Sequence, residues 1–238
     1  MKLSQYTLPL MLFCSMLTAE NFNFKSYGNF SNIIQKKDLS SKVSLNNLKL
    51  NNKGVYATGA LANAEGEITV FDGNVFISLG KSGKDVVINE VKSNPKAMLL
   101  AMGTVNTWSE PIEVEEDVLD LDFYDLLANE AIRLGIESQT FVFKIEGEFN
   151  DVRWHIVNGK NDEKPIEGEK QPTMRKLFIE ESAVAGIVFG FYTFGEQGIF
   201  THPGENYHAH AIFNNQTQAG HIDDFTIKAG SKIYIGVE

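Results

Sequence analysis

The sequence predicts an α+β protein dominated by strands, with mixed or antiparallel sheets in two packed halves. Short apolar segments recur from Gly54 onward, and turn sequences such as Asp72-Gly73 separate them. In contrast, a single long stretch, between Leu119 and Leu134, places apolar residues at helical spacing. With 238 residues, of which 43% are hydrophobic, the chain can bury the core of one domain or of two packed halves.

The first part of the chain leads from a polar segment into strands. Residues 22–50 are rich in Asn, Lys and Ser, and their spaced apolar residues indicate one or two short helices that lie against the core. The Asp72-Gly73 dipeptide, between two alternating apolar segments, is a strong signal for a hairpin. We expect strands at residues 55–61, 67–71 and 74–80, and further strands at residues 85–91 and 97–108.

The stretch from Leu119 to Leu134 predicts the one main amphipathic helix. Its apolar residues recur at intervals of three and four, which places them on one face. Acidic residues precede and begin the helix, where they interact favourably with the positive end of its dipole. Gly135 follows the last residue of the pattern and is typical of the position after a helix.

The chain after the helix returns to strands. Residues 139–157 predict a hairpin that turns near Gly147, and residues 176–194 predict two strands that meet near Ala185-Gly186. Between these segments lies a charged loop at residues 159–172. This loop is the expected boundary between the two packed halves.

The first 19 residues have the pattern of a secretory signal peptide. Lys2 precedes an apolar stretch, and Ala19 lies before Glu20, the first acidic residue. An apolar stretch of about ten residues is too short to cross a bilayer, so we expect no integral membrane span. The alternative is an N-terminal core strand. The interpretation we favour is export, to the periplasm or the medium, and the bulky Phe13 before Cys14 disfavours a lipid anchor there.

Composition restricts the chemistry of the mature chain. Its single cysteine, Cys14, lies in the predicted signal peptide, so removal of that peptide would exclude disulfides, thiol catalysis and cysteine-ligated zinc.

The chain is acidic, with a formal net charge of −10. A negatively charged protein surface repels the phosphate backbones of nucleic acids. We therefore expect no nucleic-acid partner.

The segment from Tyr207 to His221 contains three of the five histidines and predicts a metal site on a C-terminal hairpin. His208 and His210 are two residues apart, so a strand would project both imidazoles from one face. A four-residue loop at 214–217 would pair His210 with His221, whose side chain then shares that face. Three histidines with open coordination positions are typical of a catalytic transition-metal site. The alternative is a hairpin with solvated histidines, but the neighbouring apolar residues would direct them toward an interior or a cleft.

Several segments together resemble the α-acetolactate decarboxylase family, which uses zinc to convert 2-acetolactate to acetoin. The resemblance runs from about Gly54 to Phe225 and is most specific at the histidine hairpin. It implies that residues 20–238 form one acetolactate decarboxylase-like domain and that His208, His210 and His221 are zinc ligands. The segments that carry it, in order, are GALANAEGEITVFDG, FVFKIEGEFNDV, AGIVFGFYTF, the Pro-Gly before YHAH, and AGHIDDF.

The resemblance also implies roles for other residues, and the chain departs from the family at several of them. Glu67 matches the family's active-site glutamate and is expected to donate a proton. The family's arginine is replaced by His155, so either His155 or the nearby Arg153 is expected to bind the substrate carboxylate. Ala60 replaces a threonine of the family. The family's C-terminal glutamate has no assigned counterpart, because Glu238 is only 17 residues after His221.

The expected function is therefore zinc-dependent decarboxylation of 2-acetolactate or a related β-keto acid, by a carboxy-lyase that acts on a small keto or hydroxy acid. A homodimer is compatible with these features. Two alternatives remain. The chain could keep the metal site but lack the family's catalysis and act as a binding or structural protein, or it could be an iron oxygenase that uses the three histidines and Glu67.

Overall fold

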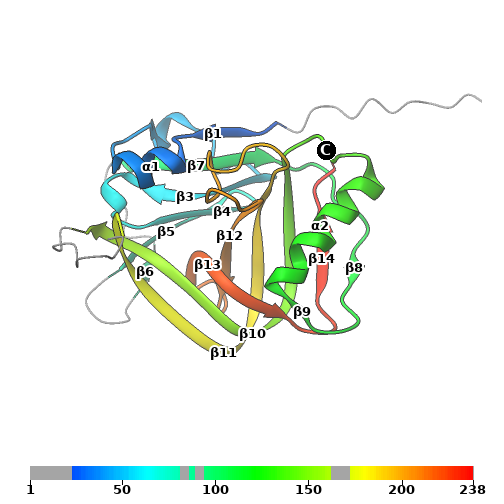
Figure 1. The fold of residues 1–238 in the computed structure, drawn as a ribbon. Coiled ribbons are helices and arrows are strands. Elements are labelled where there is room, and N and C mark those ends of the chain that lie inside the picture. The colour runs from blue at the N-terminus through cyan, green and yellow to red at the C-terminus, as the bar shows by residue number, and fades with distance from the viewer. Residues whose placement is uncertain (1–22, 81–85, 89–93, 162–171, 238) are drawn as a thin grey trace, which may run out of the picture.

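The computed structural model describes residues 23–80, 86–88, 94–161 and 172–237. These residues form two seven-stranded sheets, and every strand pairing within them is antiparallel. The first sheet lies across the top of Figure 1, and the long curved strands of the second lie below it. The architecture confirms the predicted strand-dominated α+β class.

The first sheet contains the strands from the N-terminal part of the chain. The segments predicted on either side of Asp72-Gly73 form a hairpin in which Phe71 pairs with Asn74, and both turn residues have positive φ. The strands, in spatial order, are β1 (Lys25–Tyr27), β7 (Lys96–Thr104), β3 (Val55–Leu61), β4 (Glu67–Phe71), β5 (Asn74–Gly80) and β6 (Val86–Ile88), and β2 (Val43–Ser44) also pairs with β7.

The second sheet curls so that four of its strands close into a ring. β13 pairs with both β12 and β10, and β11 connects β10 to β12. The strands, in spatial order, are β8 (Ile112–Glu113), β14 (Lys232–Ile235), β10 (Phe141–Lys160), β11 (Met174–Tyr192), β12 (Tyr207–Phe213), β13 (Gln218–Ile227) and β9 (Val118–Leu119).

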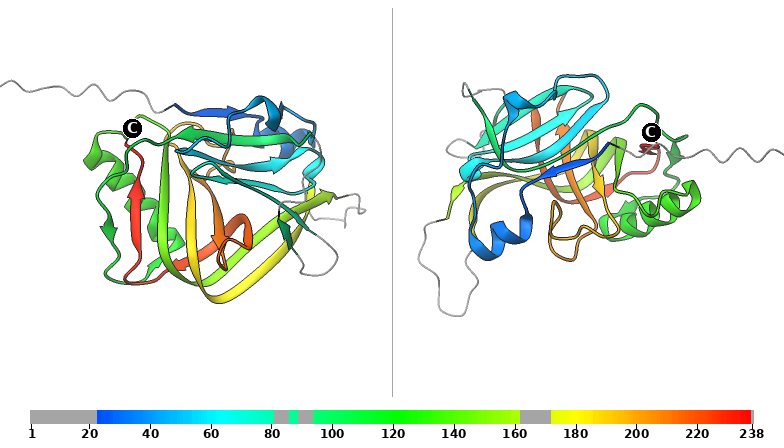
Figure 2. Two further views of the ribbon diagram at one scale, coloured as in Figure 1. Left: turned by 180° about the vertical axis from the view of Figure 1, so that it is seen from behind. Right: turned by 90° about the horizontal axis from the view of Figure 1, so that it is seen from above.

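Two α-helices lie at opposite ends of the molecule (Figure 2). The predicted main helix is α2 (Asp120–Leu134), which buries Phe123, Leu127 and Ala131 and ends at Gly135 with φ 71°. In the polar entry segment, α1 (Phe30–Lys36) begins where the Asn29 side chain accepts a hydrogen bond from the backbone N–H of Asn32. Two short 3₁₀ helices, η1 (Leu45–Asn47) and η2 (Ala62–Ala64), flank β3.

The long strands of the second sheet correct two predictions. β10 does not turn near Gly147, and β11 is not divided at Ala185-Gly186. Both glycines permit close packing within continuous strands. A Cβ atom on Gly147 would lie 2.1 Å from Ser231 Oγ, and one on Gly186 would lie 2.4 Å from the carbonyl oxygen of Ile212.

We expect Gly186→Ala to destabilise the protein, because the added methyl group would meet the backbone of the neighbouring strand. Overpacking of this kind costs ~1–3 kcal/mol. For a chain of this size, each kcal/mol lowers the melting temperature by roughly 2–4 °C. Thermal unfolding should be compared with that of Gly195→Ala, where a Cβ atom would meet nothing within 4 Å. Equal melting temperatures for the two variants would contradict this account of Gly186.

The structure divides the chain elsewhere than at the predicted boundary of residues 159–172. The chain passes from the first sheet to the second between β7 and β8, at residues 105–111. Residues 159 and 160 instead end β10, and the rest of this segment, of which 162–171 lie outside the described part, leads to β11, the hydrogen-bonded neighbour of β10 in one sheet. Composition indicated a loop there but could not show that its flanking strands pair with each other.

The two sheets pack face to face through aromatic side chains. Tyr56 of β3 and Phe71 of β4 contact Phe189 of β11, with ring centroids 6.1 and 5.2 Å from that of Phe189. Such edge-to-face pairs stabilise a core beyond the area that they bury. The packing brings β3 and β4 close to the histidine hairpin.

The N-terminal prediction concerns residues that the structure does not describe. The predicted signal peptide, residues 1–19, lies outside the described part of the chain. Among the described residues, neither helix has the length and apolar character that a membrane span requires.

Candidate active site

The three histidines of the C-terminal hairpin form a cluster between the sheets. His210 of β12 lies directly opposite His221 of β13, and Phe213 pairs with Gln218, as the loop length predicts. One ring nitrogen from each of His208, His210 and His221 lies within 4.8 Å of the others. His208 and His210 are buried, and His221 is partly buried.

Two threonines of the first sheet orient these rings. Thr58 Oγ1 of β3 lies 3.3 Å from His208 Nδ1, and Thr69 Oγ1 of β4 lies 2.7 Å from His210 Nδ1. Because each Nδ1 is held by a hydroxyl, the Nε2 atoms of both rings are directed toward the cluster. Hydrogen bonds of this kind fix ring orientation at metal sites.

The cluster fits a divalent transition metal ion. His210 Nε2 is buried and has no hydrogen-bond partner among the described residues, which is costly unless another ligand satisfies it. His208 Nε2 lies 2.9 Å from His221 Nδ1. Burial lowers the pKa of His208 to about 3 and lowers that of His210 well below its ordinary value. Both rings are therefore neutral near pH 7 and offer lone pairs to a metal.

Glu67 lies beside this cluster. Its Oε2 atom is 3.8 Å from His210 Nε2, and its Oε1 atom accepts a hydrogen bond of 3.1 Å from the backbone N–H of Val157. The side chain comes from the first residue of β4 and is only 4% exposed. Burial raises the pKa of Glu67 to about 8, opposed by the hydrogen bond from Val157. The structure thus brings Glu67 and the three histidines together from two different sheets.

His155 also lies beside the cluster, where Asp223 holds it. His155 Nδ1 is 2.6 Å from Asp223 Oδ2, and the His155 ring centroid is 4.6 Å from that of His221. Asp223 is an extra residue in β13: Trp154 of β10 pairs with Ile222, whereas Arg153 pairs with Asp224. A bulge redirects side chains locally, which places the Asp223 carboxylate against His155.

Arg153 lies outside the cavity next to the histidines. Its side chain is exposed, and the guanidinium carbon lies 4.2 Å from the centre of the Phe178 ring. Arg153 is not among the residues that line the cavity. This position gives no support for a role of Arg153 in carboxylate binding.

A cavity of about 170 Å³ opens onto Glu67, His155, His208 and His221. Its far wall is apolar, formed by α1, β7, and the ends of β10 and β11. Ala60, which replaces the family's threonine, also lines it and pairs directly with Glu67. The lining residues of the apolar wall include Phe30, Ile33, Met98, Leu99, Val157 and Met174.

Sequence reasoning missed several polar residues of the site. Lys176 and His202 line the cavity, and Thr58, Thr69 and Asp223 contact the histidines. The position of Asp223, two residues after His221, was a signal that could have found it. Lys176 had no such signal, because the sequence analysis placed no site residue near it in the chain, although Thr173 and Met174 also line the cavity. Glu238 lies outside the described residues.

Three crystal structures of other proteins share this fold. An acetolactate decarboxylase from Bacillus subtilis subspecies spizizenii has 14% identity and a TM-score of 0.68, with 91% of this chain and 86% of that chain covered. The enzyme from Bacillus subtilis strain 168 has 15% identity and the same TM-score and coverage. A Staphylococcus aureus protein of unknown function, similar to α-acetolactate decarboxylase, has 16% identity, a TM-score of 0.64, and coverage of 89% and 84%. Identities this low show the fold alone.

The sequence itself provides the family assignment. No curated protein matches the chain. The model of the family described as alpha-acetolactate decarboxylase matches residues 29–237, which include every strand of both sheets except β1, and every histidine of the cluster. Since this match spans most of its length, the chain belongs to the alpha-acetolactate decarboxylase family.

Proposed function

We propose that this protein is a zinc-dependent decarboxylase that converts 2-acetolactate, or a related β-keto acid, to acetoin or its analogue. The observation that carries the proposal is the meeting of Glu67 with the three-histidine cluster: Glu67, His208 and His221 line one cavity, and the Nε2 atom of the buried His210 lies 3.8 Å from Glu67 Oε2. The three histidines would hold the ion. Neutral nitrogen ligands with an open position are typical of catalytic zinc.

Decarboxylation leaves an electron pair on the carbon that carried the carboxylate. A divalent ion held by His208, His210 and His221 would supply Lewis-acid stabilisation of the negative charge that develops on the substrate oxygens. Glu67 then protonates the carbon from which carbon dioxide departed. A carboxyl group buried in an apolar wall suits this task, because burial favours its protonated form.

The remaining residues shape the substrate site. The backbone N–H of Val157 fixes one oxygen of Glu67, so the other is available on the histidine side. His155 lines the same cavity, and Asp223 fixes its ring orientation. The apolar wall limits water around the reacting carbon.

Export through residues 1–19 remains part of this proposal. The N-terminal mass of the protein made in a secreting bacterium would test it.

The proposal predicts that the purified protein forms acetoin from 2-acetolactate. Treatment with a chelator should abolish this acetoin formation. Readdition of zinc should restore activity. Acetoin and carbon dioxide should be measured together, with metal content on the same sample. A protein that keeps a full equivalent of metal but forms no acetoin would contradict the proposal and support the alternative of a metal-binding protein without this catalysis. Iron as the bound metal would support the oxygenase alternative.

A further inference from the structure

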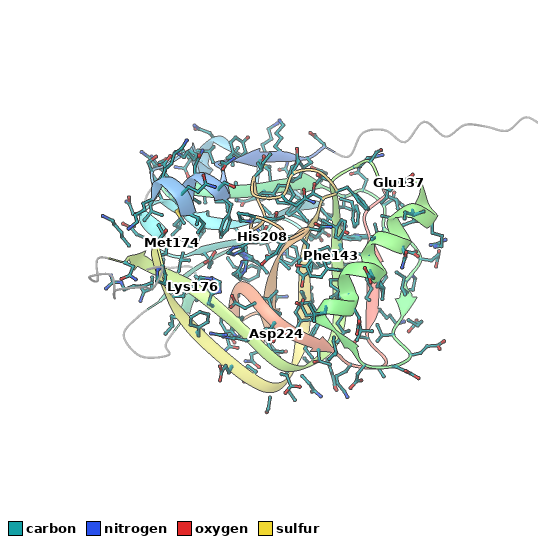
Figure 3. All side chains as sticks on the ribbon, in the orientation of Figure 1. Glu137, Phe143, Met174, Lys176, His208 and Asp224 are labelled. Carbon is teal, nitrogen blue, oxygen red and sulfur yellow. The ribbon has the colours of Figure 1, made fainter. Side chains whose placement is uncertain are left out.

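The cavity next to the histidines contains a lysine that the sequence motifs do not identify. Lys176 lies on β11 opposite Val157 of β10, and Met174, two residues earlier, lines the cavity with it. Figure 3 labels Met174, Lys176 and His208 in this region of the molecule. Among the described residues that line the cavity, Lys176 is the only lysine or arginine.

The ammonium group of Lys176 retains the capacity to bind an anion. Its Nζ atom lies 3.8 Å from Asp223 Oδ1, which exceeds a hydrogen-bond distance. Within the described part of the chain, this ammonium group donates no hydrogen bond, although it carries three N–H donors. The side chain is 26% exposed, so the group is neither sequestered in the core nor directed fully into solvent.

Asp223 positions both groups on this side of the cavity. One of its oxygens contacts His155 Nδ1 at 2.6 Å, and the other faces Lys176. His155 therefore has one ring nitrogen engaged by a hydrogen bond, whereas Lys176 Nζ has a longer ion pair with Asp223 and lies 5.9 Å from the centre of the Phe178 ring, so its N–H donors can still turn toward a ligand.

We propose that Lys176 binds the carboxylate of the substrate, in place of the guanidinium that Arg153 does not bring into the cavity. This assignment rests on the proposed function and specifies its substrate class. The substrate carries one carboxylate, which Lys176 binds; its hydroxyl and ketone oxygens lie on the histidine side, and its methyl groups face Phe30, Met98 and Leu99. A second acidic group would find no further cation among the described lining residues.

The test compares the affinities of two ligands that cannot be decarboxylated. Each is bound separately to the zinc-loaded protein, and its affinity is measured by calorimetry. The first ligand is 2,3-dihydroxy-2-methylbutanoate, in which an alcohol replaces the reacting ketone. The second is 2-methylbutane-2,3-diol, in which a methyl group replaces the carboxylate. Lys176→Met should weaken binding of the acid roughly 10- to 100-fold and leave binding of the diol unchanged. Lys176→Arg should restore much of the affinity for the acid.

Two further variants complete the design. Arg175→Met removes the exposed cation of the adjacent residue, and Arg153→Met removes the guanidinium that lies outside the cavity. Both variants should bind the acid and the diol as the wild type does. Equal acid binding by Lys176→Met and the wild type would overturn the assignment, as would equal losses for acid and diol or a loss confined to Arg153→Met. Selective loss in Lys176→Met supports the assignment even if the wild type forms no acetoin, so failure of the proposed function remains distinguishable.

Discussion

Replacing His210 with alanine should remove the bound metal and reduce acetoin formation to the uncatalysed level. His210 is fully buried, its Nδ1 is held by Thr69, and its Nε2 has no hydrogen-bond partner in the described part of the chain. Loss of this nitrogen leaves two histidines, and catalytic zinc sites usually require three protein ligands. Metal content should be measured by elemental analysis and activity by acetoin formation.

His202→Ala is the matched control for metal content. The His202 ring centroid lies 6.2 Å from that of His221 and 4.0 Å from that of Phe30, in a tilted contact, but His202 is not a member of the three-histidine cluster. This variant should keep its metal. If His210→Ala retained metal at the wild-type level, or His202→Ala lost it to the same extent, the ligand assignment would be wrong.

Replacing Glu67 with glutamine should lower the rate of acetoin formation by roughly 10²- to 10⁴-fold, the usual contribution of a positioned proton donor. Glutamine has nearly the same shape, and its carbonyl oxygen can still accept the hydrogen bond from Val157 N–H. The fold and the metal content should therefore be retained. The decisive measurement is the rate under saturating substrate, together with metal content and a melting curve.

Glu65→Gln provides the control for a change of charge in the same turn. Glu65 is exposed and does not line the cavity with Glu67, so its variant should form acetoin at the wild-type rate. A Glu67→Gln protein with normal activity would refute the assigned role. A Glu67→Gln protein that loses its metal would instead make Glu67 part of the metal site.

The structure corrects predictions that depended on reading glycine as a break in a strand. Gly147 and Gly186 lie inside strands of 20 and 19 residues, because each faces a neighbouring strand too closely for a side chain. A glycine in a turn and a glycine at a close approach look alike in a sequence. Asp72-Gly73 was assigned correctly because alternating strands of suitable length flank it on both sides.

The sequence by itself determined the histidine hairpin. Side chains alternate along a strand and the loop has four residues, so the opposition of His210 and His221 follows from local rules. The family resemblance added Glu67. Only the tertiary structure decided what surrounds these groups. Packing of the first sheet brings Thr58 and Thr69 to the rings, and a bulge turns Asp223 toward His155. β11 places Lys176 in the cavity wall, whereas Arg153 lies outside the cavity. These contacts join residues far apart in the chain, and periodicity within one strand carries no information about which distant strand packs against it.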